Sequence, residues 1–417
     1  MTPDKPSDPD PTLDRRGFVR RGLLLGPALA APAAAAPAAD PEPWRHQPGA
    51  PFSDYGQPAP QEQATRRRAG LNHRGIDGNG AAWTPLERLE GTLTPNGLHF
   101  VRNHNGTPAI DATRHRLLLH GRLRQPLAWD VEALLRYPLR SQQLFIECGG
   151  NSNAGWHEEP AQRPAGLLHG LVSCSEWSGV PLSLLLEEAG AERGAGWLVA
   201  TGADAGAFHM SLPLEKAFDD CLVALYQNGE RLRPENGYPL RLLVPGWRGV
   251  NSVKWLASLQ VADQPAMGRN ETARYTELLP SGRARQFAFE MQVKSLITTP
   301  SHGQSLPGPG WQELRGLAWS GRGRIVRVEV SADGGASWRD ATLQGPVLPR
   351  CLTRFRAPWS WEGRPAVLQS RATDESGAVQ PGRAALLAER GTRGFYHYHA
   401  IVSWEVDAHG YVSHGYA

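Results

Sequence analysis

A chain of 417 residues with a formal net charge of +3 is long enough for two or three domains, at roughly 100–200 residues each. Its near-neutral charge, with no basic stripe interleaved with aromatic residues, argues against nucleic acid as a partner. Beyond the N-terminal region no segment reaches the ~20 apolar residues that a membrane-spanning helix needs, so we expect no membrane anchor.

The first predicted element is an export signal. Arg15 and Arg16 stand shortly before the apolar run Leu23–Ala30, and alanine- and proline-rich sequence with signal-peptidase sites follows. This three-part pattern is typical of twin-arginine signals, which export proteins that have already folded, often around a cofactor. A disordered basic tail is the alternative. We predict a signal peptide over residues 1–39 and a periplasmic protein that hides a cofactor site.

Two regions follow the signal. Residues 40–95 are rich in proline, glycine, glutamine and charge and show little periodicity, so we predict an extended arm there. Residues 96–287 mix strands and helices. We predict strands over 115–121 and 144–148, and the second runs into the turn-forming cluster Gly149-Gly150-Asn151.

Helical spacing over 129–135 and 181–190 predicts two helices in the same region, the second ending at a glycine. The pattern changes over residues 288–417. The segment 325–330 alternates apolar and polar residues and meets a glycine-rich hairpin turn, and 366–374 reads as a further strand. Short strands with few helical runs predict a β-sandwich of ~100–130 residues.

The cysteines point to one candidate site. Cys148, Cys174, Cys221 and Cys351 lack the Cys-x-x-Cys spacing of zinc ribbons and iron–sulfur clusters, and the chain has no Cys-x-x-Cys-His, so we expect no haem of its own. Cys148 stands at a strand end before the glycine turn. There it could be an inert core residue, a nucleophile, or the single thiolate ligand of a metal carried by an organic cofactor. The last interpretation also explains the export signal.

At these residues the chain resembles the sulfite oxidase family of molybdenum enzymes, and within it the molybdenum subunit of periplasmic Sox-system sulfane dehydrogenases. The resemblance runs from about residue 92 to the C-terminus. It rests on six stretches, which are specific in combination: Gly97–His104, Phe145–Ser152, Ser175–Leu182, Pro234–Trp247, Val253–Leu256 and Val328–Trp338.

The resemblance implies an α+β fold, with a sulfite-oxidase-type molybdopterin domain over 96–287 and an immunoglobulin-like dimerisation domain over 288–417. It implies molybdenum with molybdopterin as the cofactor and Cys148 as the metal ligand. Arg102, His104 and Tyr275 are the implied catalytic residues, although the residues around Tyr275 match the family poorly. The implied cofactor-binding residues are Phe100, Val101, Arg102, Asn103, His104, Asp204, Asn236, Arg241, Ser252, Val253 and Lys254. Arginine and lysine donors suit an anionic cofactor phosphate and an anionic sulfur substrate.

The sequence departs from the animal-type enzymes at three positions. Ser152 and Asn153 stand where those enzymes have two arginines, and Asn236 stands where they have a histidine. Fewer positive charges lower the attraction for free sulfite dianion. We therefore expect a Sox-type substrate, a sulfane sulfur held on a carrier protein.

The resemblance further implies electron transfer to a separate c-type cytochrome subunit and a homodimer formed through the C-terminal domain. Oxidation of free sulfite is the alternative within the same class. Nitrate reduction is a third possibility, because plant-type nitrate reductases share this fold, but those enzymes also carry haem and flavin regions. A non-catalytic binding or assembly protein is the alternative from another class, and molybdenum analysis would distinguish it.

Overall fold

The computed structural model describes residues 51–71, 75, 78–192 and 196–416, so the predicted export signal lies outside the described residues. Residues 51–59 contain no helix or strand and belong to the unit that precedes Pro60. From Pro60 onward the described residues form one unit. Within the described ranges, no helix has the length and apolar character required to cross a membrane.

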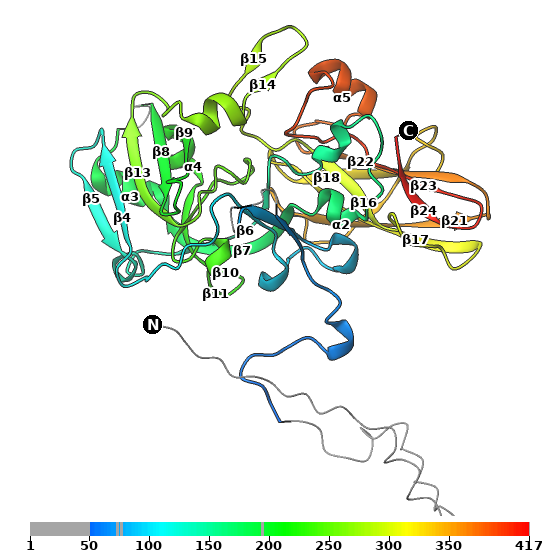
Figure 1. The fold of residues 1–417 in the computed structure, drawn as a ribbon, viewed down its shortest axis with the longest axis horizontal. Helices are drawn as coiled ribbons and strands as arrows, with labels where there is room; N and C mark the ends of the chain where they lie inside the picture. Colours follow the sequence, from blue (N-terminus) through cyan, green and yellow to red (C-terminus); the bar gives the residue numbers. More distant parts are fainter. Residues whose placement is uncertain (1–50, 72–74, 76–77, 193–195, 417) are drawn as a thin grey trace, which may run out of the picture. The chain divides into compact units, whose positions relative to one another are not determined.

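Two five-stranded sheets dominate the first half of this unit (Figure 1). One has the strand order β5-β4-β13-β8-β9, with bounds Leu127–Asp130, Arg116–Gly121, Leu256–Ala262, Trp197–Gly202 and His209–Pro213. The other has the order β11-β10-β7-β6, with β12 also paired to β10, and bounds Glu230–Arg231, Leu222–Gln227, Val172–Pro181, Arg140–Glu147 and Arg241–Leu243. A three-stranded sheet joins β1, β2 and β3, at Arg68–Leu71, Gly80–Trp83 and Val101–Asn103. Its first two strands occupy the end of the predicted arm.

The helices of this half are short. The α-helices are α1 (Val131–Leu134), α2 (Ala165–His169), α3 (Leu182–Ala189) and α4 (Leu214–Asp219). Single 3-10 turns are η2 (Pro60–Glu62), η3 (Leu86–Arg88), η4 (Asn96–Leu98), η5 (Asn153–Trp156) and η6 (Pro234–Asn236), and η7 (Asn270–Arg274) is a π-helical turn.

Most local predictions for this half are confirmed. In β4, Leu117 and Leu119 are fully buried while their neighbours face outward, as a strand with one buried face requires. Helix α3 ends at Gly190, whose φ of 72° caps the helix in the left-handed conformation. The helix predicted over 129–135 is wrong in its first part. Residues up to Asp130 continue β5, and only then does the Asp130 side chain, accepting from Ala133 N at 2.7 Å, start α1.

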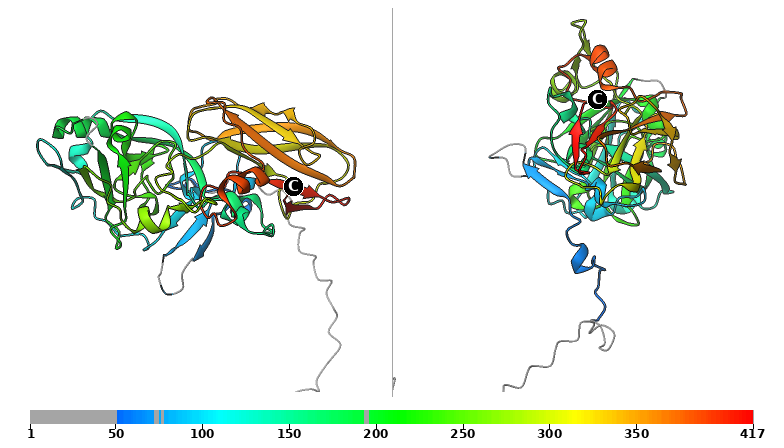
Figure 2. Two further views of the ribbon diagram at one scale, coloured as in Figure 1. Left: turned by 90° about the horizontal axis from the view of Figure 1, so that it is seen from above. Right: turned by 90° about the vertical axis from the view of Figure 1, so that its right-hand side faces the viewer.

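The second half is a β-sandwich, as predicted. One sheet has the order β16-β17-β21-β20, at Lys294–Thr299, Gly310–Trp319, Thr353–Trp361 and Thr342–Leu343. The other has the order β19-β18-β22-β23-β24, at Arg339–Asp340, Ile325–Ser331, Ala366–Asp374, Ser403–Val406 and Val412–Gly415. In the left view of Figure 2 these yellow, orange and red strands gather at one end of the unit, away from the green strands of the first half.

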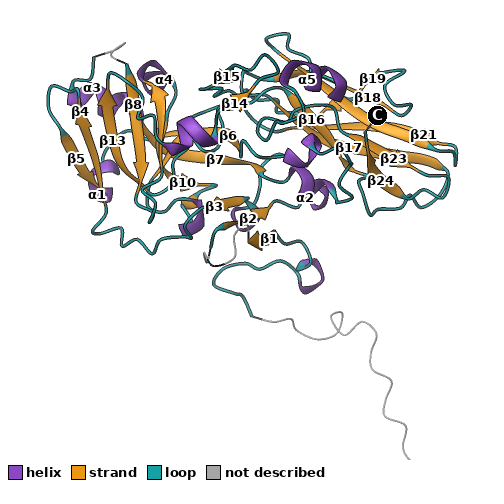
Figure 3. Ribbon diagram, turned by 45° about the horizontal axis from the view of Figure 1, so that its top comes forward, coloured by secondary structure: helices purple, strands orange, loops and turns teal. Residues whose placement is uncertain are grey.

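The two halves share a hydrophobic core. Phe145 of β6, together with Leu168, Val172 and Cys174, belongs to the same buried cluster as sandwich residues that include Leu296, Trp319 and Phe355. Figure 3 shows β6, β7 and α2 between the two groups of sheets. The strand that leads to Cys148 is therefore held from both sides, because its side chains pack into the sandwich as well as into the first half.

A segment that the sequence did not predict connects the two halves a second time. Helix α5 (Arg383–Arg390) lies beside the hairpin of β14 (Glu277–Leu278) and β15 (Ala284–Arg285), as Figure 1 shows. Arg390 forms an ion pair with Glu277, and Glu389 lies 3.9 Å from Arg285. Leu386 of α5 packs with Trp156, and this places the residues after α5 next to the Cys148 loop.

Candidate active site at the Cys148 loop

Cys148 begins a tight loop at the end of β6. Its backbone N–H donates to Leu171 O at 2.9 Å, and its carbonyl accepts from Asn151 N at 2.8 Å. Ser152 then adopts a left-handed φ of 63°, which turns the chain into η5. The loop directs the half-buried Cys148 side chain into a cavity of about 700 Å³, a volume that includes its open mouth.

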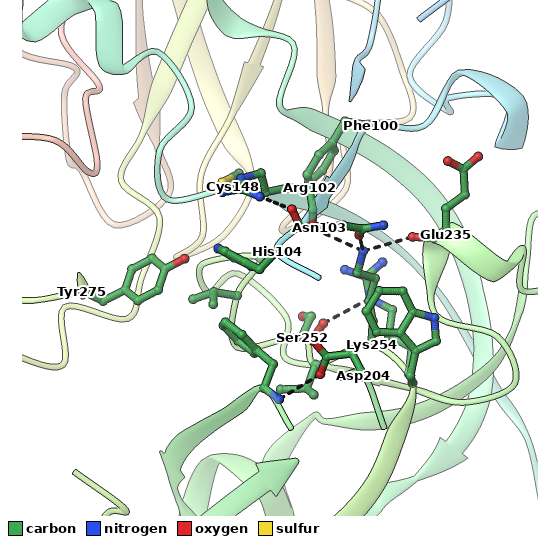
Figure 4. Close-up of a pocket in the computed structure, with 16 residues that line it drawn as sticks. Phe100, Arg102, Asn103, His104, Cys148, Asp204, Glu235, Ser252, Lys254 and Tyr275 are labelled. Carbon is green, nitrogen blue, oxygen red and sulfur yellow. Dashed lines mark hydrogen bonds between the residues drawn. The ribbon is translucent and has the colours of Figure 1, made fainter. Parts of the chain in front are cut away.

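The cavity gathers side chains from segments far apart in the sequence (Figure 4). The predicted site residues that line this cavity are Phe100, Arg102, Asn103, His104, Cys148, Asp204, Arg241, Ser252, Val253, Lys254 and Tyr275. The structure thus brings most of the predicted set together around one space.

Two predicted residues do not line this cavity. Val101 lies on β3 with a buried side chain, between the lining residues Phe100 and Arg102. Asn236 is buried, donates to Gln227 Oε1 at 2.8 Å, and accepts from Arg241 through its backbone carbonyl at 3.1 Å. Asn236 therefore contacts a cavity residue without facing the cavity.

Some lining residues lie outside the predicted set, namely Phe208, Glu235, Gly249, Val250 and Trp255. Glu235 and Trp255 fall inside the stretches that carry the family resemblance, and Gly249 and Val250 lie between two of them, so position in the sequence could have suggested them. For Phe208 there was no such signal. Its ring stacks on His104, with 5.2 Å between the ring centroids, and only the fold creates that contact.

Arg241 and Lys254 are the main electrostatic feature of the cavity. Arg241 is 5% exposed, and among the described residues its guanidinium donates to the backbone carbonyls of Ser252, at 3.2 Å, and Asn236. Lys254 Nζ donates to the carbonyl oxygens of Glu235, at 3.1 Å, and Arg102, at 3.3 Å, and to the Asn103 side chain. Burial lowers the pKa of Arg241 to about 9 and lowers that of Lys254 well below its ordinary value.

The nearby carboxylates offset these cations only in part, because the charges of Glu235 and Asp204 raise the pKa of Lys254 against the larger effect of burial. Glu235 forms an ion pair with Arg67 at 2.6 Å, and Asp204 accepts from Asn105 at 3.0 Å and from Phe208 N at 2.9 Å. In the described part of the chain, neither Arg241 nor Lys254 is within ion-pair distance of an acid. Buried cations that no carboxylate pairs with directly are costly, so this arrangement fits an anionic group that binds in the cavity.

Arg102 and His104 offer two further donors near Cys148, the first cationic and the second neutral. Arg102 lies on β3 and donates to Gly80 O at 3.3 Å. Burial and the charge of Arg102 lower the pKa of His104 to about 4, so its imidazole is neutral at physiological pH. His104 can therefore donate or accept one hydrogen bond but carries no charge.

Tyr275 follows η7, and its hydroxyl points into the cavity (Figure 4). Its ring lies 4.6 Å from the ring of Tyr396, and the Arg248 guanidinium is 5.0 Å from its centroid. Burial, followed by the nearby Cys148, raises the pKa of Tyr275 far above its ordinary value. The phenol is therefore a neutral hydrogen-bond donor.

The Cys148 thiol is suited to a metal that replaces its proton. Burial raises the pKa of Cys148, while a hydrogen bond from Gly150 N and the charge of Arg102 lower it in part. A thiol in this setting holds its proton until a metal ion takes its place, and a soft thiolate suits a transition metal. Together with Arg241 and Lys254, with which no described carboxylate pairs directly, these residues fit a molybdenum cofactor with an anionic organic part.

Fold and site together define a molybdopterin-dependent oxidoreductase. Residues 104–270 match the model of the oxidoreductase molybdopterin binding domain, and residues 285–403 match that of the Mo-co oxidoreductase dimerisation domain. The predicted enzyme class, the molybdenum–molybdopterin cofactor and the α+β fold with a sandwich are confirmed.

The chain belongs to the sulfite oxidase family and is similar to its SoxC members. One chain of the crystal structure of the sulfane dehydrogenase SoxCD from Paracoccus pantotrophus superposes with a TM-score of 0.86 at 41% identity, over 89% of this chain and 96% of that one. Mitochondrial sulfite oxidase of Mus musculus is 30% identical over 331 residues, 72% of this chain and 60% of the relative. NADH nitrate reductase of Solanum lycopersicum is 32% identical over 312 residues, 66% of this chain. The chain spans about a third of the length of such plant nitrate reductases.

Proposed function

We propose that this protein oxidises reduced inorganic sulfur, and that its substrate is a sulfane sulfur bound to a carrier protein. The observation that carries the proposal is the cavity at Cys148, with Arg102, His104 and Tyr275 around the thiol in a chain that resembles a sulfane dehydrogenase. Fixed donors that face one space bind a negatively charged terminal sulfur and hold it in a defined orientation.

Each group of residues has a distinct part in the proposed reaction. Bound molybdenum–molybdopterin supplies oxygen-atom transfer and accepts two electrons. Arg241 and Lys254 hold the anionic part of the cofactor, and Cys148 binds the metal. Arg102 binds the negative charge of the substrate, and neutral His104 and Tyr275 donate hydrogen bonds to it.

The electrons leave to a c-type cytochrome subunit in this proposal, because the sequence has no Cys-x-x-Cys-His site of its own. The solved relative is a SoxCD complex, which supports a two-subunit assembly. The match of residues 285–403 to a dimerisation domain supports a homodimer of the molybdenum subunit. Export by the twin-arginine route would place this assembly in the periplasm.

The test compares electron donors on the matured enzyme. The protein is purified with and without its co-expressed cytochrome, its molybdenum is quantified, and cytochrome reduction is measured with a persulfide-bearing carrier and with sulfite. We expect about one molybdenum per chain and a kcat/KM at least tenfold higher with the carrier. A higher value with sulfite would make the protein a sulfite dehydrogenase, and a folded, matured protein without molybdenum would refute the enzymatic function.

The nitrate reductase relatives motivate one further arm, because they share the molybdenum fold. The enzyme is first reduced with viologen as the electron donor, and nitrate is then added as the oxidant. We expect no nitrate-dependent oxidation of the viologen above the rate without enzyme. Turnover of nitrate faster than that of either sulfur substrate would refute the proposed sulfur chemistry while leaving the molybdenum site intact.

A further inference from the structure

A fully buried ion pair lies directly behind the Cys148 loop. Lys294 Nζ is 3.2 Å from Glu147 Oε1, and the two side chains are 1% and 2% exposed. Glu147 directly precedes Cys148 in the sequence, so its carboxylate side chain is attached to the residue before the thiol. An ion pair this far from water demands complete hydrogen bonding, because either charge alone would be strongly destabilising.

The pair is the centre of a network that holds both ends of the loop. Lys294 Nζ also donates to Ser152 Oγ at 2.5 Å, and Asn151 Nδ2 donates to Glu147 Oε1 at 2.9 Å. The Trp319 indole N–H donates to Glu147 Oε2 at 2.7 Å. Residues immediately before and after the Cys148-Gly149-Gly150 turn are thus tied to one ammonium group.

This ammonium group comes from the second half of the chain. Lys294 opens β16 and Trp319 closes β17, where the two residues are paired across the strands and the Lys294 ammonium lies 5.4 Å from the Trp319 ring. The second half also contacts the other side of the loop, where His397 N donates to Gly149 O at 2.8 Å. The sandwich therefore holds the loop from two directions.

We propose that Lys294 and Trp319 are positioning residues for the molybdenum thiolate, so that the sandwich domain forms part of the redox centre in addition to any role in assembly. The inference rests on Cys148 as the metal ligand. Lys294 acts through Glu147 and Ser152 by fixing the path of the loop, and hence the direction from which Sγ meets the metal.

The experiment uses the holoenzyme variant Lys294→Met, which keeps most of the length of the side chain and removes its charge. Without the ammonium group, the buried Glu147 carboxylate is strongly destabilised and Ser152 loses its donor, so the hydrogen bonds at both ends of the loop must rearrange. We expect the Mo(V) electron paramagnetic resonance signal of the partly reduced enzyme to shift or to split into more than one species. We also expect kcat to fall at least tenfold, with KM changed less than twofold.

Lys216→Met is a matched control. Lys216 likewise pairs with a carboxylate, Asp220 at 2.7 Å, and lies 5.5 Å from a tryptophan ring, that of Trp247, but it does not line the Cys148 cavity. The control should lose some thermal stability and keep the wild-type Mo(V) signal. If Lys294→Met behaves in the same way, with a lower unfolding temperature, an unchanged signal and an unchanged kcat, its role is purely structural and the proposal is wrong.

Two further measurements keep the proposal testable if Lys294→Met does not fold. Trp319→Phe removes the indole donor to Glu147 together with part of the buried ring, and we expect a smaller shift of the same signal, whereas an identical signal would overturn the proposal. In the metal-free protein, the rate at which iodoacetamide alkylates Cys148 should change at least fivefold in Trp319→Phe and stay unchanged in the control. This rate also separates the positioning role of Lys294 and Trp319 from the proposed function. It tests the conformation of the Cys148 loop even if the wild-type protein binds no molybdenum.

Discussion

At the scale of single residues, the site depends on the chemistry of one sulfur atom. Cys148 is the one cysteine that lines the cavity, as far as the structure describes the chain, whereas Cys174, Cys221 and Cys351 are buried in the cores. A free cysteine is most often an inert core residue, and three of the four fit that description. The position of the fourth at a strand end, in a cavity with two cations that form no ion pair among the described residues, favours a metal ligand.

Cys148→Ser should therefore yield a folded protein that does not turn over. The hydroxyl is a poorer ligand for a soft metal, while the half-buried position tolerates the loss of sulfur. Arg241 and Lys254 still hold the cofactor in this variant, so we expect the Mo(V) signal to change and kcat to fall at least a hundredfold, with an unchanged far-ultraviolet circular dichroism. The control is Cys221→Ser, because Cys221 donates to Lys216 O at 3.2 Å and a serine can replace it as donor. A wild-type Mo(V) signal and a wild-type kcat in Cys148→Ser would refute the assignment.

Tyr275→Phe removes a neutral donor without changing the charge of the cavity. Because the pKa of Tyr275 lies far above physiological pH, the phenol donates a hydrogen bond at every pH at which the enzyme is assayed. Loss of one fixed donor near the reacting atoms lowers kcat by roughly 10- to 100-fold. Steady-state kinetics on the molybdenum-loaded variant measure this effect. A kcat within twofold of the wild type would exclude Tyr275 from the chemistry.

At the scale of elements, α5 and the segment after it cover the Cys148 loop. Arg390 ends α5, is 3% exposed, and donates to His397 O at 2.6 Å and to Tyr396 O at 2.8 Å. Its guanidinium also lies 4.9 Å from the Trp156 ring. This one side chain therefore fixes the backbone that places Tyr396 against Tyr275.

Arg390→Leu should destabilise this element by about 3 kcal/mol, because two buried carbonyl groups lose their charged donor. Denaturant unfolding measures the loss, and hydrogen exchange over residues 391–399 should rise with it. Arg364→Leu is the control, since Arg364 is 80% exposed and pairs with Glu362 at the surface, where such pairs contribute less than about 1 kcal/mol. Equal losses in the two variants would contradict the role of Arg390.

At the scale of the whole molecule, a set of buried and half-buried histidines links stability to pH. Burial is the largest cause that lowers the pKa of each, to about 3 for His99, to about 4 for His104 and His399, and well below the ordinary value for His169 and His397. In the unfolded chain the same side chains titrate near 6.5. Between these values the unfolded chain binds more protons, so the free energy of unfolding rises with pH and falls as the solution is acidified.

We therefore expect the metal-free protein to lose stability steadily between about pH 6.5 and pH 4. Each histidine that stays neutral contributes about 2 kcal/mol of destabilisation by pH 5, so the set accounts for several kcal/mol. Urea unfolding at a series of pH values measures the slope. His169→Phe should lower the slope of the unfolding free energy against pH by the equivalent of about one bound proton. An unchanged slope would contradict the assignment of His169 as a buried neutral group.

Much of the local structure was predictable because its causes lie within a few residues. A leucine run that ends in a glycine turn predicted β4, and a glycine at the helix end predicted the limit of α3. The prediction for 129–135 went wrong where two local patterns overlap, since Asp130 both ends β5 and caps α1. Helix α5 was not predicted, because the other segments of its region show the sequence pattern of strands.

The sequence by itself determined the chemical groups of the site, since Cys148, Arg102, Arg241 and Lys254 lie in stretches whose residue order identifies the family. Only the tertiary structure decided which side chains from the second half reach that site. Lys294 contacts Glu147 across 147 positions of the chain, a separation over which no periodicity or spacing carries information. Contacts of this kind arise when the sandwich and β6 bury their apolar faces in one shared core, which brings together polar groups that are remote in the sequence.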